Sequence, residues 1–394
     1  MNTSRTPRPL MVAVGVTVTA LGLAACTSDP SPAASAPIAP LPTPMATSVQ
    51  TAAGTWASVP MGNLDDPLNT FWQLFLQPAG QDSWSNKVEA TATATNGGLV
   101  LASRDGQQLV VGIRPSNHLH YTPIIATSNG GTTWDNGLLD ARLASSPDAL
   151  AVSRAGSALA LETTDADVSE VVSGSGLSSW QPVVTKNALD SSPAGRRCRP
   201  TELTAAGFIG SRPLVGAACR KPGATAIFAQ KGSAWQLVGP RLPRSASRDR
   251  FEVLALMPSS SGVTALLGAS GTAGTGVTGA WTSDGTGWQA STPLRVPDGE
   301  ELVSYGPTNL GGVFALFATG SGSRYLYTLD ASGEGWQLEP TPPPGTRTVA
   351  YEAGGTVDAL AVGNNVLTVW RLEPARGWRR TQTIWVPIQY GSSS

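Results

Sequence analysis

Two histidines stand two residues apart, at His118 and His120, and this spacing could support metal chemistry. Alternate side chains of a β-strand point to the same face, so both imidazoles would lie together, as metal ions prefer. A metal would need further ligands, and we identify none in the sequence. We therefore interpret both as solvated loop histidines and expect no metal and no cofactor.

Arginine is concentrated in two short stretches, one around a cysteine and one before Phe251. They contain Arg196, Arg197, Arg199, Arg241, Arg244, Arg248 and Arg250. Guanidinium groups bind carboxylates and phosphates through paired hydrogen bonds. Two such loops on one face would form an anion-binding or partner-binding site, and the alternative is ordinary solvated charge.

The overall charge argues against nucleic acid as a partner. The 394 residues include 26 basic and 27 acidic side chains, a formal charge of −1, which leaves no basic excess to bind a phosphate backbone. Charged residues make up only 13%, and the chain has 44 glycines and 31 prolines. This composition indicates many turns and little amphipathic helix.

The N-terminus has the pattern of an export signal. Two arginines, Arg5 and Arg8, precede an apolar run over 10–23, and Leu23-Ala24-Ala25-Cys26 follows. This ending resembles the lipobox of bacterial lipoproteins. The resemblance implies cleavage before Cys26, attachment of diacylglycerol and fatty acyl chains such as palmitate to that residue, and a location on the extracytoplasmic face of the cell membrane. An ordinary cleaved signal or an uncleaved anchor is the alternative.

The proposed cleavage divides the chain into three parts. Residues 1–25 form the signal peptide, 26–53 a disordered tether rich in Pro, Ala and Ser, and 54–394 the folded domain. Prolines at 30, 32, 37, 40, 42 and 44 favour an extended spacer. With Cys26 lipidated, Cys198 and Cys219 remain as an even pair in an oxidising compartment, which favours a disulfide over free thiols or a metal site.

Tryptophan recurs through the domain at intervals of 42 to 55 residues. The repeated positions are Trp84, Trp134, Trp180, Trp235, Trp288, Trp336 and Trp378. Short β-type runs separated by Gly, Ser, Asn and Asp fill each interval, about four to a unit. This arithmetic predicts an all-β propeller of four-stranded blades. Seven blades fit best, six or eight remain open, and the run 383–390 could supply a strand that the first unit lacks.

One unit carries a motif at its tryptophan. The segment from Thr127 to Trp134 reads TSNGGTTW and resembles the Asp-box, or BNR repeat, of sialidase-type propellers, with Asn129 where Asp is usual. Degenerate copies precede Trp288 and Trp336. The resemblance implies a turn between the last two strands of a blade, so we interpret Asn129, Trp134 and Trp288 as scaffold and not as catalytic residues.

Sialidase chemistry needs three arginines, a Tyr-Glu pair and an acid. Candidates exist in Arg114, Arg324, Arg347 and the adjacent Tyr351 and Glu352. A chain this rich in arginine offers such candidates by chance, and we assign no catalytic residue.

We therefore expect a monomeric, membrane-anchored lipoprotein whose propeller is a non-enzymatic scaffold for an envelope protein or glycan. A sialidase-like hydrolase, a glycan-binding propeller and a small-ligand sensor are the alternatives.

Overall fold

The computed structural model describes residues 45–387 with gaps at 64–69, 88–96, 105, 115–119, 165–166, 243–246, 260–261, 272–273, 298, 310, 332 and 334. The chain divides into two compact units, Met1–Pro40 and Leu41–Ser394, and all described residues belong to the second. The signal peptide, Cys26 and most of the expected tether therefore lie outside the described residues. Within the described part, no helix has the length and apolarity needed to cross a membrane.

Strands form where short apolar runs alternate with turn residues. Leu99–Arg104 and Gln108–Ile113, for example, pair in antiparallel register around a turn at Gly106. That glycine has φ +68°, a conformation that costs an L side chain energy but glycine little. Valine and leucine dominate both runs and are buried, because each strand packs between neighbouring sheets.

Four sheets have four strands each, in sequential antiparallel order. The first contains β1 (Thr47–Thr51), β2 (Gly54–Gly62), β3 (Thr70–Pro78) and β4 (Ser85–Lys87). The second contains β5 (Leu99–Arg104), β6 (Gln108–Ile113), β7 (Thr122–Thr127) and β8 (Asp135–Leu139). Two more contain β23 (Glu300–Pro307), β24 (Val313–Thr319), β25 (Arg324–Leu329) and β26 (Trp336–Leu338), and then β27 (Thr346–Tyr351), β28 (Val357–Gly363), β29 (Val366–Glu373) and β30 (Gly377–Trp385).

Two larger sheets lie between these in sequence. A five-stranded sheet contains β9 (Arg142–Leu143), β10 (Leu150–Val152), β11 (Ala158–Thr164), β12 (Asp167–Gly174) and β13 (Trp180–Thr185). A nine-stranded sheet contains β14 (Pro200–Ile209), β15 (Arg212–Cys219), β16 (Ala226–Lys231), β17 (Ala234–Leu237), β18 (Arg250–Ser259), β19 (Gly262–Gly271), β20 (Gly274–Thr282), β21 (Gln289–Ala290) and β22 (Leu294–Arg295). One residue pair, Ala218 with Glu252, joins its β14–β17 and β18–β22 halves.

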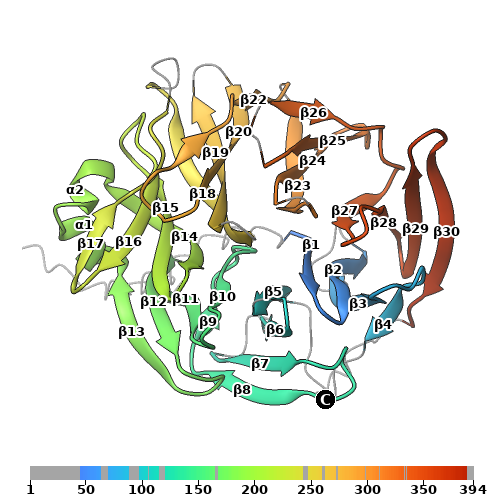
Figure 1. Cartoon of the computed structure of the whole chain (residues 1–394), viewed down its shortest axis with the longest axis horizontal. Coiled ribbons are helices and arrows are strands. Elements are labelled where there is room, and N and C mark those ends of the chain that lie inside the picture. Colours follow the sequence, from blue (N-terminus) through green and yellow to red (C-terminus); the bar gives the residue numbers. More distant parts are fainter. Residues whose placement is uncertain are drawn as a thin grey trace, which may run out of the picture. The chain divides into compact units, whose positions relative to one another are not determined.

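The sheets follow one another around a common centre, and each has one or two strands nearest the middle (Figure 1). These innermost strands are β1, β5, β10, β14, β18, β23 and β27. Buried side chains fill the spaces between neighbouring sheets. Trp56 and Trp72 pack on Leu99 and Ile125 of the next sheet, for instance. The expectation of an all-β propeller is confirmed at this level.

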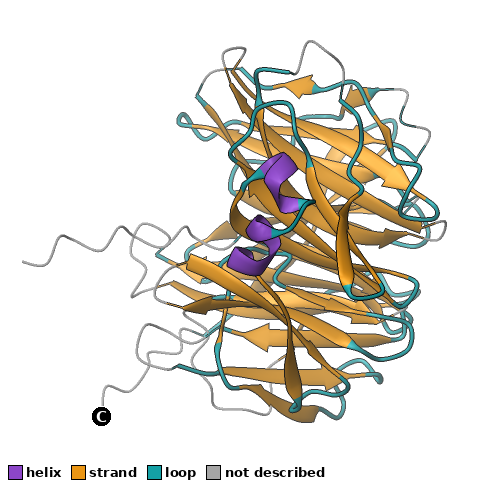
Figure 2. Cartoon of the chain, turned by 90° about the vertical axis from the view of Figure 1, so that its left-hand side faces the viewer, coloured by secondary structure: helices purple, strands orange, loops and turns teal. Residues whose placement is uncertain are grey.

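Only two helices occur in the described residues, and both are short. α1 (Lys186–Ser191) and α2 (Gly195–Cys198) connect β13 with β14. Thr185 begins α1 as its N-cap, since its hydroxyl accepts a hydrogen bond from the Ala188 N–H at 3.1 Å. Figure 2 shows the two helices outside the strand layers.

An ion-pair network centred on a buried carboxylate joins the first sheet to the last. Asp358 on β28 is fully buried and accepts a hydrogen bond from Trp84 Nε1 at 2.9 Å. Arg371 on β29 donates to the same carboxylate through Nε, also at 2.9 Å. The guanidinium further contacts Glu352 at 3.2 Å and Asp82 of the β3–β4 connection. We refer to these five residues as the closing network, because they tie together the two ends of the series of sheets.

The expected boundary at residue 54 is wrong, because β1 lies inside the segment assigned to the tether. Its polar side chains find partners in the interior. The hydroxyl of Ser48 donates to the Val349 carbonyl at 3.0 Å, and that of Thr47 lies 3.1 Å from the hydroxyl of Ser58. Ser and Thr at these positions predicted solvent exposure, whereas hydrogen bonding lets the strand be buried.

The expected closure by the C-terminal run also fails within the described residues. Thr383, Ile384 and Trp385 end β30 and pair with β29 of their own sheet. The strand that the first unit lacked is β1, which precedes β2 in the sequence. The series is closed mainly by side chains, since Ala57 and Phe75 of the first sheet pack with Leu360 and Val369 of the last, and the Gly62 N–H also donates to the Asn364 carbonyl at 2.9 Å.

Candidate functional site

The first arginine stretch follows β13 and contains α2. Arg196 and Arg197 lie on this helix with exposed side chains, and Arg199 ends it with φ 58°. Such a left-handed conformation is uncommon for a residue with a side chain. The Arg199 N–H donates to the Gly195 carbonyl at 2.6 Å, which completes the helical turn.

A disulfide fixes this stretch to the end of β15, where the β15–β16 connection begins. Cys198 and Cys219 are bonded, with their Cα atoms 5.1 Å apart, as the sequence predicted. Beside the bond, the Arg220 N–H donates to the Arg199 carbonyl at 3.0 Å, and the Lys221 N–H donates to the Cys198 carbonyl at 3.1 Å. Two further exposed cations thus join the arginines. Sequence reasoning missed them, although they directly follow a cysteine expected to form this bond.

The second arginine stretch connects β17 with β18 and meets the same connection. The Gly223 N–H donates to the Asp249 carbonyl at 2.8 Å, and the Thr225 hydroxyl donates to the Pro240 carbonyl at 2.9 Å. Arg241, Arg248 and Arg250, neighbours of these contact points, are exposed, whereas Arg244 lies outside the described residues.

The structure therefore brings both stretches to one place. We call the combined surface the basic edge, defined by Arg196, Arg197, Arg199, Arg220, Lys221, Arg241, Arg248 and Arg250. The disulfide and the backbone hydrogen bonds hold its three connections together, so its charges are positioned before any ligand binds.

Four acidic residues, Asp190, Glu202, Asp249 and Glu252, lie in the same stretch of sequence as these cations. The Asp249 carboxylate is buried and pairs with Arg295 at 2.8 Å. Glu202 and Glu252 lie just inside β14 and β18 and are exposed. Neighbouring protein atoms partly desolvate the Glu252 carboxyl although the residue is exposed, and this effect, together with repulsion from Glu202, raises the pKa of Glu252. Because the basic side chains outnumber these carboxylates, the surface suits an anion.

The sialidase candidates do not form a cluster. Arg114 is buried, donates to the Leu143 and Gly97 carbonyls, and has its pKa lowered to about 10 by burial and by Arg142. Arg324 is also buried and donates to the Thr346 carbonyl at 2.9 Å. Both guanidinium groups donate to backbone carbonyls of the neighbouring sheet, Arg114 to Leu143 and Arg324 to Thr346, and thus have structural contacts.

The Tyr-Glu pair has structural contacts as well. Tyr351 is buried and stacks on Phe314, with ring centroids 5.7 Å apart. Burial raises its pKa, which holds the phenol neutral. Glu352 contacts Arg371 in the closing network. Arg347, on the same innermost strand as Tyr351, has a partner in the described structure.

The two histidines remain unresolved as a pair, since His118 lies outside the described residues. His120 is exposed. No group of three His, Cys, Asp or Glu side chains within the described ranges has an arrangement that could hold a metal ion.

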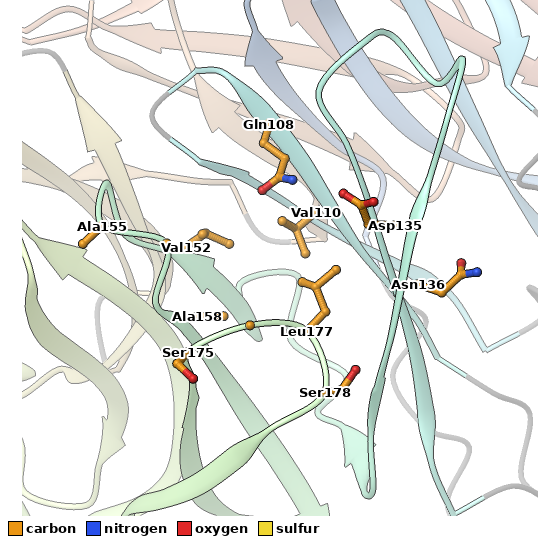
Figure 3. A pocket seen from close by; sticks show the side chains of 12 residues that line it. Gln108, Val110, Asp135, Asn136, Val152, Ala155, Ala158, Ser175, Leu177 and Ser178 are labelled. Atoms are coloured by element: carbon orange, nitrogen blue, oxygen red, sulfur yellow. The ribbon is translucent and has the colours of Figure 1, made fainter.

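A cavity of about 410 Å³ lies between sheet β5–β8 and the five-stranded sheet. Gln108, Val110 and Leu177 face its middle, while Asp135 and Asn136 lie at its rim (Figure 3). The Leu177 carbonyl accepts a hydrogen bond from the Leu138 N–H at 2.8 Å, so the neighbouring sheet fixes this wall. The lining combines an apolar floor with amide, carboxylate and hydroxyl groups.

No family model matches the sequence, and no curated protein matches it either. Solved structures do resemble the fold. A xyloglucanase from Xanthomonas campestris is 14% identical with a TM-score of 0.57, over 86% of this chain and 54% of that one. The present chain thus spans about half of the xyloglucanase. A candidate 6-phosphogluconolactonase from Bacteroides uniformis is 12% identical with a TM-score of 0.52, over 86% and 98% of the two chains.

A third similar structure is described as a propeller. It is a fungal lectin, Aleuria aurantia lectin, described as a six-bladed β-propeller, with 12% identity and a TM-score of 0.41 over 88% of this chain and 97% of the lectin. Similarities at these identities concern the fold and do not transfer an activity. The successive sheets around a common centre define the class of this fold as the β-propeller.

Proposed function

We propose that this chain is a membrane-anchored extracytoplasmic lipoprotein whose propeller is a non-enzymatic binding scaffold for a protein or another envelope component. The signal and lipobox residues up to Cys26 support the anchor and the location. The observation that carries the binding role is the basic edge, where three connections separated in sequence meet with exposed cations held in place by a disulfide.

Seven four-stranded blades form part of the same proposal. The four separate four-stranded sheets, the five-stranded sheet and the two halves of the nine-stranded sheet supply seven groups, each with one innermost strand. Only one residue pair links the two halves of the nine-stranded sheet, which supports counting them separately.

The Asp-box assignment also belongs here. The Thr127–Trp134 turn lies between β7 and β8, the last two strands of its sheet. The Thr133 N–H donates to Asn129 Oδ1 at 3.0 Å, and Trp134 packs edge-on against Trp56 with centroids 6.1 Å apart. These contacts support a scaffold role for the turn.

The test of the scaffold is affinity purification of the tagged chain from gently cross-linked membranes, followed by mass spectrometry. We expect Cys26 to label with lipid and a stoichiometric partner to copurify. Cys26→Ser should abolish labelling and release the protein from membranes that are washed with high salt, and the partner should be lost with it. Retention of the Cys26→Ser chain on membranes after this wash, which removes purely electrostatic binding, would contradict the anchor.

Glycan binding is a second candidate, favoured by the cavity beside Gln108. Amide, carboxylate and hydroxyl groups above an apolar floor can hydrogen-bond a neutral sugar. A glycan array should then give a signal that the double variant Gln108→Ala/Asp135→Ala loses, while the variant Lys231→Ala, on a different sheet and exposed, retains it. An array without signal for the wild-type chain removes this candidate.

A further inference from the structure

The direction of the innermost strands determines which connections share an edge of the propeller. β14 and β18 are both antiparallel to β15, so they run in the same direction. The Thr264 hydroxyl of the β18–β22 group donates to the Gly311 carbonyl just after β23 at 3.2 Å, so β18 and β23 end at the same edge. The starts of β14, β18 and β23 therefore lie together at the opposite edge.

The folded body begins at this starting edge as well. Ala46 forms a parallel bridge with Ser304 of β23, and the Ser48 hydroxyl binds the Val349 carbonyl of β27. β1 therefore runs in the direction of β23. Met45, the first described residue, packs beside Leu254 and Leu302. The part of the chain before Met45 therefore joins the folded domain at the edge where the innermost strands start.

The basic edge lies at this starting edge. Arg199 directly precedes β14, and Arg250 begins β18. Arg220 and Lys221 follow β15, which is antiparallel to β14 and so ends where β14 starts. The exposed cations and the attachment point of the N-terminal segment therefore belong to one side of the propeller.

We propose that the basic edge docks on an anionic phospholipid surface. The inference rests on the proposed anchor at Cys26 and specifies one ligand for the scaffold. Residues 27–44 can span at most about 60 Å when extended, so a lipid on Cys26 would keep this edge within reach of the bilayer. Diacylglycerol on Cys26 would hold the chain at the membrane through more than one acyl chain, and a basic surface would orient the propeller on anionic lipid.

The position of the charges favours lipid over an acidic protein as the ligand. A protein partner could bind any side of the propeller, whereas the tether presents its own attachment side to the membrane. Arg154, Lys231 and Arg376 are also exposed, but they lie in turns at the opposite edge, where first and second or third and fourth strands meet. These three residues provide a matched control.

The experiment uses the full chain with Cys26→Ser, so that binding does not depend on acylation. Cosedimentation is measured with vesicles of phosphatidylcholine alone and of phosphatidylcholine mixed with phosphatidylglycerol. We compare Arg197→Glu/Arg220→Glu/Arg248→Glu, with one change in each connection of the basic edge, with Arg154→Glu/Lys231→Glu/Arg376→Glu. Thermal unfolding of every variant verifies that the fold is retained.

We expect binding to the anionic vesicles only, weakening with salt, and a decrease of at least about tenfold in the basic-edge variant. The control variant, with the same net charge, should bind within about twofold of the parent. Equal losses in both variants, or no binding to anionic vesicles, would overturn the proposal. A copurifying acidic protein that is lost in the basic-edge variant while vesicle binding persists would also overturn it.

The two proposals fail in different ways. Absence of lipid on Cys26 in the wild-type chain contradicts the anchor, whatever the vesicles show. Lipid on Cys26 without vesicle binding by the Cys26→Ser chain leaves the anchor intact and removes the docking surface.

Discussion

Arginine has opposite roles in two regions of this molecule. In the closing network, Arg371 is mostly buried and contacts the carboxylates of Asp358, Glu352 and Asp82. Hydrogen bonds to Asp358 are the main cause that raises the pKa of Arg371. At the basic edge, Arg197 and Arg248 extend into solvent from connections held by a disulfide and backbone hydrogen bonds.

The difference shows what each region uses to hold its parts together. The closing network joins two sheets through the charges themselves, so those charges are committed to stability. The basic edge joins its connections through covalent and backbone bonds, which leaves its charges available for a ligand. Burial and the nearby carboxylates, rather than residue type, separate structural arginines from binding arginines.

The largest effect should come from Arg371→Ala. This change leaves Asp358 buried without its cation, and we expect the free energy of unfolding to decrease by about 3–5 kcal/mol. Arg379→Ala is the control, because Arg379 pairs with Glu373 at 2.6 Å but its side chain is 66% exposed. We expect that change to cost less than about 1 kcal/mol. Urea denaturation measures the free energy of unfolding of both variants. Equal losses would contradict the expected difference between the buried and the exposed ion pair.

A smaller effect should follow from opening the disulfide. Cys198→Ser/Cys219→Ser removes a bond across 21 residues, and we expect a loss of about 2–4 kcal/mol in the free energy of unfolding. Binding to anionic vesicles should weaken too, because the connections carrying Arg199 and Arg220 are no longer fixed. Reduction of the wild-type protein should reproduce both changes. Unaltered stability on reduction would show that the backbone hydrogen bonds are sufficient to hold these connections together without the disulfide.

The smallest effect concerns a carboxylate without a cation. Asp148 accepts a hydrogen bond from the Leu256 N–H at 2.7 Å, and burial raises its pKa to about 7 despite that bond. The folded state therefore holds a proton that the unfolded state has released between about pH 4 and 7. The stability contribution of this group is fully present below about pH 4 and is lost as the pH rises through 7.

Asp148→Asn keeps the acceptor and removes the charge. Because the side chain is partly accessible, we expect the variant to be more stable than the parent by about 1–2 kcal/mol at pH 8. The difference should shrink towards pH 4. Unfolding measured across this range tests the prediction, and a difference independent of pH would assign the effect to packing.

The sequence predicted the architecture well because each repeat buries residues locally. Evenly spaced tryptophans and Gly-rich turns indicate repeated sheets, because the strands of each sheet follow one another along the chain. The disulfide was predictable for a similar reason, since the compartment and the even count of cysteines limited the options.

Features that depend on distant residues were missed. The buried β1 segment looked like solvated tether, because the partners of Ser48 and Thr47 cannot be read from its own composition. The closing network joins Arg371 to Asp82, which lies 289 residues away. The arginines of the basic edge were identified, but Arg220 and Lys221 were not, although the disulfide expected between Cys198 and Cys219 would have placed them beside Arg199.

Closure by side chains also affects the order of folding. A chain synthesised from its N-terminus completes sheet β1–β4 long before β28 and β29 exist. Until then, Ala57 and Phe75 lack the apolar partners that the last sheet supplies. An incomplete chain therefore exposes apolar surface that is prone to aggregation. Pairing of the first sheet with the last must therefore be a late step with very long-range contacts, which slows folding and creates a need for protection by chaperones.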